Sequence, residues 1–383
     1  ATLYGYVRGE FAFDSRQVVA AREGNYIDLA SPVNKVNGKD LNANPNFNGW
    51  GVESRLGVKI AGPEFFGMKS EALIESHFFG SSDASINTLA LRHAYVKLSS
   101  DKVEWLVGQF WHPMFVTNVS PRTYNFNAGS PFQPFNRSPQ IRFSTKGNAR
   151  LTLAAITERD FASVGGKANL SALPAFHAQL QFGNDDKFVG GFGANYKSLK
   201  SGLRGEYFGA FTFLAYAKAK LGQNSAWQIY ADYGQNPSEL LQLGGVAVDA
   251  KGKYKSNNTL ALWTEFYGDF TPSFEWGIFG GYSKDFGFSK NTTPSATKFG
   301  QMADIINPLT GKVEGQYLAG TPISTWRVSP RVGWKSGNTK LTAELDYTST
   351  TYGAWDTNLK TKKYAQDATA GNFRVSLSLI QNF

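Results

Sequence analysis

Residues 372–383, with the sequence NFRVSLSLIQNF, decide the fold. In an extended strand successive side chains point to opposite faces. One face of this segment carries Phe373, Val375, Leu377, Leu379, Gln381 and Phe383, and the other carries Arg374, Ser376, Ser378, Ile380 and Asn382. A strand with one apolar and one mostly polar face belongs to a sheet packed on a protein core or to a barrel whose apolar face meets lipid.

The same alternation begins the chain and recurs along it. Leu3, Val7 and Phe11 share one face of the first segment, whereas Arg8 and Glu10 share the other. Further segments of this kind occur near residues 51–60, 68–78, 175–182, 226–233, 273–285, 325–335 and 340–348. Counting all of them predicts about sixteen strands of roughly ten residues, the length that a tilted strand needs to cross a bilayer. An even number of strands places both chain ends on the same side of the membrane.

The connections between these segments alternate in length. Short links are expected near residues 61–67, 99–102, 146–148, 184–187, 221–225, 270–272 and 336–339. Long loops are expected over 15–49, 113–138, 160–172, 236–258, 287–322 and 351–371, with shorter ones near 81–88 and 198–204. Membrane barrels sort their connections in this way, with short turns on one side and long loops on the other. We therefore predict a single all-β domain over residues 1–383, a transmembrane antiparallel β-barrel of about sixteen strands.

Composition agrees with a barrel and excludes other classes. Aromatic residues make up 15% of the chain, which has 40 Gly and no Cys, so no disulfide or thiolate metal site is expected. The longest nearly apolar run is YFGAFTFLAYA, about half the roughly twenty residues that a spanning helix needs. The net charge is +9, but the basic residues are spread along the chain and match no nucleic-acid-binding module. We expect no nucleic-acid partner.

The long loop at residues 113–138 is the expected constriction loop. A wide aqueous barrel discriminates between solutes only when something narrows it, and an inward-folded loop is the usual means. This loop has no acidic residue and contains Arg122, Tyr124, Phe126 and Arg137. The alternative is an ordinary exposed loop.

Three stretches in and around this loop carry a resemblance to a known family. They are HAYVKL at 93–98, GQFWHPMF at 108–115 and NRSPQIRFS at 136–144, and they resemble the DcaP-like outer-membrane channels, a branch of the trimeric porins. The motifs cover about residues 93–146, and the terminal Phe383 is more broadly porin-like. The resemblance implies sixteen strands, a homotrimer in the Gram-negative outer membrane among its lipid and lipopolysaccharide, and passive uptake of small, often anionic solutes. Family members often begin with a helical extension, whereas Leu3 here already lies in the first expected strand.

The alternation places a set of arginines on the lumenal face. The expected pore-lining residues are Arg8, Arg55, Arg142, Arg327, Arg331 and Arg374, together with Lys59 and Glu10. Because the first, second and last strands are neighbours in a closed barrel, Arg374, Arg8 and Arg55 are expected to form a basic wall. The alternative is that the arginines pair with lumenal carboxylates such as Glu53, Glu75, Glu265 and Glu344. We predict a preference for anionic, for example carboxylate, or neutral solutes, because basic side chains at a constriction select anions.

Two other functions are weighed against a general porin. The first is a substrate-specific channel for a sugar or an aromatic acid. Its apolar binding surface would be formed by Phe115, Tyr124, Phe126, Phe132 and Phe135. The alternative is that these rings pack against the barrel wall. The second, more remote, is an outer-membrane hydrolase. The 4 His lie on separate segments, and only His112, just before Pro113 at the entrance of the constriction loop, is a candidate for a catalytic base. We expect no catalytic residue, no metal site and no cofactor.

Overall fold

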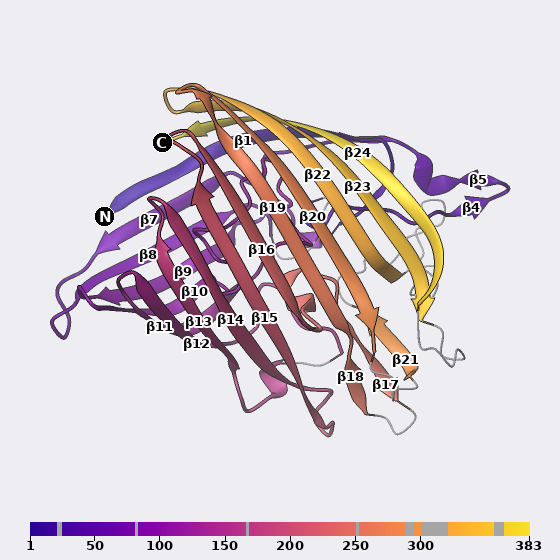
Figure 1. Cartoon of the computed structure of the whole chain (residues 1–383), viewed down its shortest axis with the longest axis horizontal. Coiled ribbons are helices and arrows are strands. Elements are labelled where there is room, and N and C mark those ends of the chain that lie inside the picture. The colour runs from indigo at the N-terminus through magenta and orange to yellow at the C-terminus, as the bar shows by residue number, and fades with distance from the viewer. Residues whose placement is uncertain are drawn as a thin grey trace.

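The structure, a computed structural model, describes residues 1–20, 25–80, 83–165, 168–249, 253–288, 294–299, 321–355 and 364–383. Its main feature is a closed antiparallel barrel, formed within these ranges by sixteen strands that pair in chain order (Figure 1). The second strand is interrupted and counts as β6 and β7. The barrel strands are β1 (Thr2–Asp14), β6 (Asn46–Trp50) with β7 (Arg55–Ala61), β8 (Lys69–His77), β9 (Ala90–Ser99), β10 (Val103–Trp111), β11 (Arg137–Thr145), β12 (Ala149–Ile156), β13 (Ala175–Asn184), β14 (Phe188–Lys200), β15 (Tyr207–Lys220), β16 (Ser225–Gln235), β19 (Asn258–Thr271), β20 (Phe274–Gly287), β22 (Thr321–Ser336), β23 (Thr339–Trp355) and β24 (Tyr364–Asn382). Pairing of β1 with β24 closes the barrel.

The smaller elements lie in the long loops, at the barrel end opposite the two termini (Figure 1). The first loop contains β2 (Val18–Val19), β3 (Leu29–Ala30), β4 (Lys35–Val36), β5 (Lys39–Asp40) and the 3-10 turn η1 (Leu41–Ala43). The others contain η2 (Asp83–Ser85), η3 (Ala168–Leu170), η4 (Ser238–Leu240), β17 (Gly245–Asp249), β18 (Tyr254–Ser256) and β21 (Pro294–Phe299). Strands β17, β18 and β21 form a separate sheet beyond the barrel strands.

The barrel is apolar outside and polar inside. On β24, Leu377 is 51% exposed, whereas its neighbour Ser376 is 4% exposed and Arg374 is buried. The same inversion holds for β1, where Val7 faces out and Glu10 faces in. A band of exposed Leu, Val and Phe around a polar interior fits a barrel whose outer face meets hydrocarbon. The predicted fold class is confirmed. Within the described ranges, no helix has the length and apolar character needed to cross a membrane.

The boundaries of several predicted loops need correction. The expected loop at 351–371 is wrong, because β23 continues to Trp355 and β24 already begins at Tyr364. Both segments are rich in Thr, Gly and Ala, so their alternation of apolar and polar residues is weak. The two strands nevertheless pair along this whole length. Arg137, expected in the constriction loop, is the first residue of β11. Most of the expected loop at 287–322 lies outside the described residues.

Charge placed on the outer face is predicted to destabilise the barrel. Leu377 lies well within β24 and faces outward. We expect Leu377→Arg to lower the free energy of unfolding by about 2–4 kcal/mol, the cost of placing Arg in the middle of the hydrocarbon layer. Urea titration of the protein folded into lipid vesicles measures this change. Leu377→Phe is the matched control, and equal stability of the two variants would contradict a lipid-facing β24.

Candidate functional site: the lumen and its constriction loop

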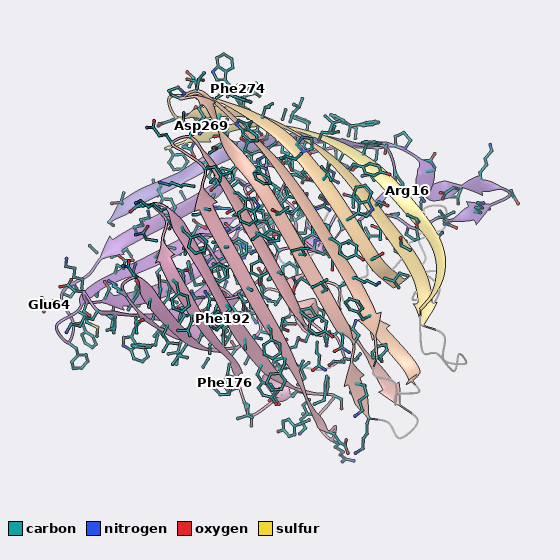
Figure 2. The ribbon with its side chains drawn as sticks, viewed as in Figure 1. Arg16, Glu64, Phe176, Phe192, Asp269 and Phe274 are labelled. Carbon is teal, nitrogen blue, oxygen red and sulfur yellow. The ribbon has the colours of Figure 1, made fainter. Side chains whose placement is uncertain are left out.

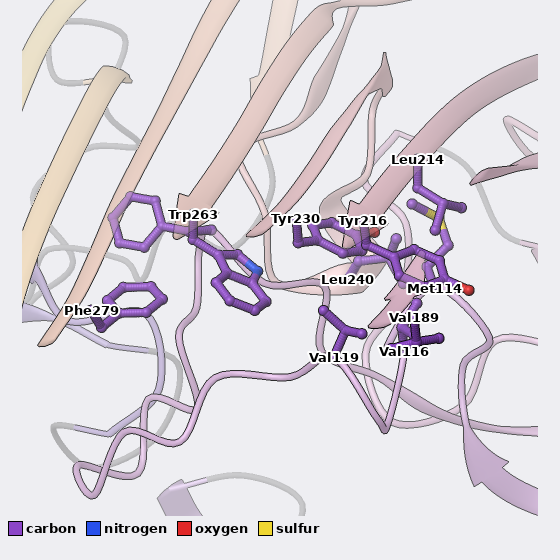
Figure 3. Close-up of a cluster of buried hydrophobic side chains, with 11 residues drawn as sticks. Met114, Val116, Val119, Val189, Leu214, Tyr216, Tyr230, Leu240, Trp263 and Phe279 are labelled. Atoms are coloured by element: carbon purple, nitrogen blue, oxygen red, sulfur yellow. The ribbon is translucent and has the colours of Figure 1, made fainter. Parts of the chain in front are cut away.

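The constriction loop, residues 112–136 between β10 and β11, folds into the barrel. Its apolar side chains Met114, Val116, Val119 and Phe132 are buried and form one cluster with side chains from the barrel wall (Figure 3). The wall side chains of this cluster are Val189, Leu214, Tyr216, Tyr230, Trp263 and Phe279, with Leu240 from η4. These residues belong to β14, β15, β16, β19 and β20. The loop therefore lies against that half of the wall.

Two glycines make room for the rings of this loop. A β-carbon at Gly281 of β20 would overlap the ring of Phe132, and one at Gly333 of β22 would overlap the hydroxyl of Tyr124. Both positions face the lumen, where most other strand residues carry a side chain. The missing side chains let the loop approach the wall closely, which is a common reason for glycine inside a strand. A glycine at a lumen-facing position is therefore a sequence signal for the path of the loop.

Arg327 of β22 ties the constriction loop to the first loop. It is fully buried, and its guanidinium donates to the carbonyl oxygens of Ser130 at 2.8 Å and Ile27 at 2.7 Å, and to Thr348 Oγ1 at 2.8 Å. One side chain thus joins two loops and two strands. Buried hydrogen bonds from a charged donor are stronger than neutral ones. Arg327 therefore acts as a structural anchor rather than as a free lumenal charge.

The first loop also folds into the lumen and packs on the constriction loop. Tyr26 is buried, and its ring lies 4.9 Å from that of Phe126 and 5.1 Å from that of Phe135. Asp28 accepts a hydrogen bond from Asn125 at 3.2 Å and forms an ion pair with Arg374 at 2.9 Å. Burial raises the pKa of Asp28 to about 6, against the opposing charges of Arg374 and Arg327. Phe126, one of the rings expected to form a surface for solutes, packs in this layer and is buried.

Polar contacts hold the middle of the constriction loop. The backbone N–H of Tyr124 donates to Glu344 at 2.6 Å, and its carbonyl oxygen accepts a hydrogen bond from Arg8. Its hydroxyl donates to Glu275, and burial, followed by this contact, raises the pKa of Tyr124. Arg122 is exposed, with its guanidinium 4.5 Å from the centre of the Tyr267 ring. Of the predicted loop residues, Arg122 is the one whose charged group remains accessible.

Most of the predicted lumenal arginines are paired with carboxylates. Arg8 lies 2.6 Å from Glu10 and 2.8 Å from Glu53, and Arg331 lies 2.7 Å from Glu265. Further contacts are Arg374 with Asp14 and Asp28, and Arg142 with Gln140 and the carbonyl of Trp111. Arg137, predicted in the constriction loop, pairs with Asp160. Arg8 and Arg374 thus hold the wall and the loops together, and do not present unpaired charge with Arg55 as one basic wall.

A bulge in β9 turns two more side chains, Arg92 and His93, toward the lumen. The pairing of β8 with β9 shifts between Glu75 and Ser76, so that Arg92 has no opposite residue. Arg92 and His93 are consequently both buried on the lumenal side although they are adjacent in sequence. Such a two-against-one arrangement is how a β-bulge redirects a side chain. The conflict of registers in LRHAYVKL is the sequence signal for this bulge.

The bulge opens onto a cavity that we call the basic chamber. It has a volume of about 440 Å³ and lies between β1, β7, β8, β9, β10 and the constriction loop. Its lining residues are Tyr4, Arg55, Lys59, Leu73, Glu75, Arg92, His93, Tyr95, Phe110, Trp111, Phe115, Phe126, Ala128 and Phe135. The chamber therefore combines charged groups on the barrel wall with aromatic rings from the loop and β10.

The basic chamber carries an excess of positive charge. Glu75 forms an ion pair with Arg92 at 2.8 Å and a longer one with Arg55 at 3.7 Å, so one carboxylate faces two guanidinium groups. Lys59 is exposed and lies over the ring of Tyr4, at 4.7 Å, without an ion pair to any described carboxylate. Nη1 of buried Arg92 has no hydrogen-bond partner among the described residues. Three cations and one carboxylate thus leave a net charge of plus two.

His112, the histidine at the entrance of the constriction loop, lies in a buried and positively charged environment. His112 is buried, its Nδ1 accepts a hydrogen bond from the backbone of Met114 at 3.3 Å, and its ring lies 6.3 Å from that of His177. Burial, reinforced by nearby positive charges, holds the pKa of His112 well below its usual value. Within the described ranges, no group of three or more His, Asp or Glu is placed to hold a metal ion.

Comparison with known proteins identifies the fold. No protein-family model and no curated protein matches the sequence. Among solved structures, the DcaP outer-membrane channel of Acinetobacter baumannii matches with a TM-score of 0.70 and 19% identity, over 100% of this chain and 96% of that one. The anion-selective porin from Comamonas acidovorans matches with a TM-score of 0.61 and 12% identity, over 100% and 99%.

A trimer form of OmpT, an outer-membrane protein of Vibrio cholerae, also matches, with a TM-score of 0.55 and 12% identity over 100% of this chain and 98% of that one. At these identities the likeness establishes the fold. The chain has the sixteen-stranded barrel fold of outer-membrane channels, and the resemblance to DcaP-like channels inferred from residues 93–146 is confirmed at the level of the fold.

Proposed function

We propose that this barrel is a porin of the bacterial outer membrane through which small hydrophilic solutes diffuse passively, with a preference for anionic, for example carboxylate, or neutral solutes. The basic chamber carries the proposal. It places Arg55, Lys59 and Arg92 around a single carboxylate, beside the constriction loop. Guanidinium groups stay charged and offer several donors to a carboxylate or phosphate. The anion-selective porin with the same fold is consistent with this preference.

The reversal potential in a salt gradient across a planar bilayer tests the proposal. A channel that prefers anions gives a reversal potential close to the equilibrium potential of chloride. We expect this result in potassium chloride with the purified protein. A reversal potential close to that of potassium would overturn the proposed selectivity but leave the porin fold and the passive pathway unaffected.

A substrate-specific channel for an aromatic acid or a sugar is the second candidate function. One observation favours it: Trp111 and Phe115 stack with a centroid distance of 4.0 Å at the wall of the basic chamber, and Arg92 lies 5.6 Å from the Trp111 ring. Aromatic faces beside a cation suit a flat solute with a carboxylate. Saturating block of the ion current by one solute would support this function. Equal, non-saturating effects across a panel of benzoate, acetate and glucose would favour general diffusion.

The proposed assembly is a homotrimer embedded in outer-membrane lipid and lipopolysaccharide. The trimer form of the similar Vibrio cholerae protein supports this assembly. Sedimentation of the detergent-solubilised protein, corrected for bound detergent, distinguishes one, two and three copies per particle, and a monomer at all concentrations would contradict the trimer.

A further inference from the structure

The outer surface of the barrel has a hollow in its apolar band that we call the outer groove. Its volume is about 610 Å³, and it is lined almost wholly by apolar surface of β10 to β15. The floor is formed by the small side chains of Ala155, Ala178 and Ala194, and the walls by larger ones such as Phe143 and Phe176. Phe176 is exposed on the outer face of the barrel, as is Phe192, and both are labelled in Figure 2. The groove is thus a depression between aromatic ridges rather than a gap in the wall.

Strand register explains why the depression is continuous. Ala178 of β13 is directly opposite Ala194 of β14, so two small side chains share one rung of the sheet. Toward the loop end of the same two strands, Phe176 is opposite Tyr196, and both rings rise above the alanines. Neighbouring residues on one face of a sheet lie within about 5 Å of each other. Pairs of small side chains next to pairs of large ones therefore produce a floor of alanines with an aromatic rim.

The groove leads to basic side chains at the loop end of the barrel. Tyr196 on β14 is opposite Phe211 on β15, and Lys200 is opposite Tyr207, further along the same pair of strands. Four residues along a strand correspond to roughly 13 Å. The ammonium group of Lys200 lies 5.2 Å from the centre of the Tyr207 ring. The outward face of this strand pair thus changes from alanine, through aromatic rings, to lysine.

A second hollow continues from Tyr207 and is lined by polar groups. Its volume is about 400 Å³, and Lys253 and Lys255 from the β18 region contribute to it. Glu206 also lines it and lies 3.9 Å from Lys253, with both side chains largely exposed. Among the described residues, this hollow and the adjacent Lys200 bring together three lysines and Glu206. We call this hollow with Lys200 the lysine pocket.

We propose that the outer groove and the lysine pocket form one binding site for a phosphorylated, acylated lipid of the leaflet on the loop side. An acyl chain would lie on the alanine floor, and the phosphate would be held by the lysines. The order of chemistry along β14 and β15 supports a lipid, since lipids present hydrocarbon, then an interface where aromatic rings sit, then an anionic head group. Charge complementarity selects an anionic lipid over a neutral one. In an outer membrane, the matching lipid of that leaflet is a phosphorylated glycolipid.

Native mass spectrometry of the full chain released from detergent tests the site. The probes are lipid A carrying its phosphates, the same lipid with the phosphates removed, and inorganic phosphate. We expect the wild-type protein to retain phosphorylated lipid A. Lys253→Glu with Lys255→Glu should weaken this retention by about fivefold or more per lysine, the effect of one basic residue near an anionic lipid surface. Ala178→Phe, which fills the groove, should weaken retention of both lipid forms.

Lys35→Glu with Lys39→Glu is the matched control, because these lysines are exposed on the β4–β5 hairpin, which projects from the loop end of the barrel away from the groove (Figure 1). Heat-dependent mobility on gels verifies that each variant is folded.

Three outcomes would contradict or change the proposal. Equal lipid retention by all variants, or equal loss of retention in the control, would overturn it. Complete competition by inorganic phosphate with no effect of Ala178→Phe would reduce the lysine pocket to a plain anion site. A change in the number of copies per particle in Ala178→Phe, with lipid retention intact, would make the groove a contact between subunits instead.

Discussion

Reversing two charges in the basic chamber is expected to convert an anion-preferring channel into a cation-preferring one. The double variant Arg55→Glu, Lys59→Glu changes the lining from three cations and one carboxylate to one cation and three carboxylates, so the net charge goes from plus two to minus two. Rings of carboxylates select cations, and rings of basic groups select anions. In a salt gradient the reversal potential should therefore change sign.

Both side chains can be changed without removing a buried anchor. Lys59 is exposed, and Arg55 contacts Glu75 only at 3.7 Å, whereas Arg92 retains its own 2.8 Å ion pair with that carboxylate. Lys102→Glu, on the short link between β9 and β10, is a matched single charge reversal outside the chamber, and its effect should be small. If the double variant conducts normally with an unchanged reversal potential, then solutes do not pass through the basic chamber, and the proposed selectivity mechanism fails.

Removing the guanidinium of Arg327 is expected to release the constriction loop. In Arg327→Met the carbonyl oxygens of Ser130 and Ile27 lose their buried donor. Each buried polar group left without a partner costs about 1–3 kcal/mol, which is enough to let the loop leave its place for part of the time. Because the barrel hydrogen bonds do not involve this side chain, the barrel should stay folded. Single-channel recordings should show frequent transitions between conductance levels where the wild type has a steady current.

A second variant perturbs the packing of the same loop without changing the charge of the lumen. Gly281→Leu places a side chain where the Phe132 ring lies, whereas Gly280→Leu, its neighbour on the strand, has open space around the added atoms. We expect Gly281→Leu to produce transitions like those of Arg327→Met, and Gly280→Leu to behave as the wild type. Steady currents in both Arg327→Met and Gly281→Leu would show that the contacts to Arg327 and Gly281 do not hold the loop in place.

The constriction loop shows which features of the site the sequence predicts. Its position after the fifth strand and its lack of acidic residues identified residues 113–138 as an inward loop, and the loop does fold into the lumen. Its orientation was not predictable, since it depends on which wall can accept it. Gly281 and Gly333 lie far from the loop in sequence, and their role becomes visible only when Phe132 and Tyr124 are seen against them.

The sequence by itself determined which face of each strand meets lipid and which meets water. That division requires only that apolar and polar side chains alternate along the strand, because successive side chains point to opposite faces. Leu377 outside and Ser376 inside follow from this rule alone. Tertiary structure decided which lumenal charges remain unpaired. Arg374 pairs with Asp14, at the other end of the chain, whereas Lys59 meets no described carboxylate. Periodicity assigns a face but carries no distance between strands, and electrostatic pairing depends on that distance. The bulge at Arg92 is the intermediate case, in which a broken period marked the place and only the folded barrel supplied the partners.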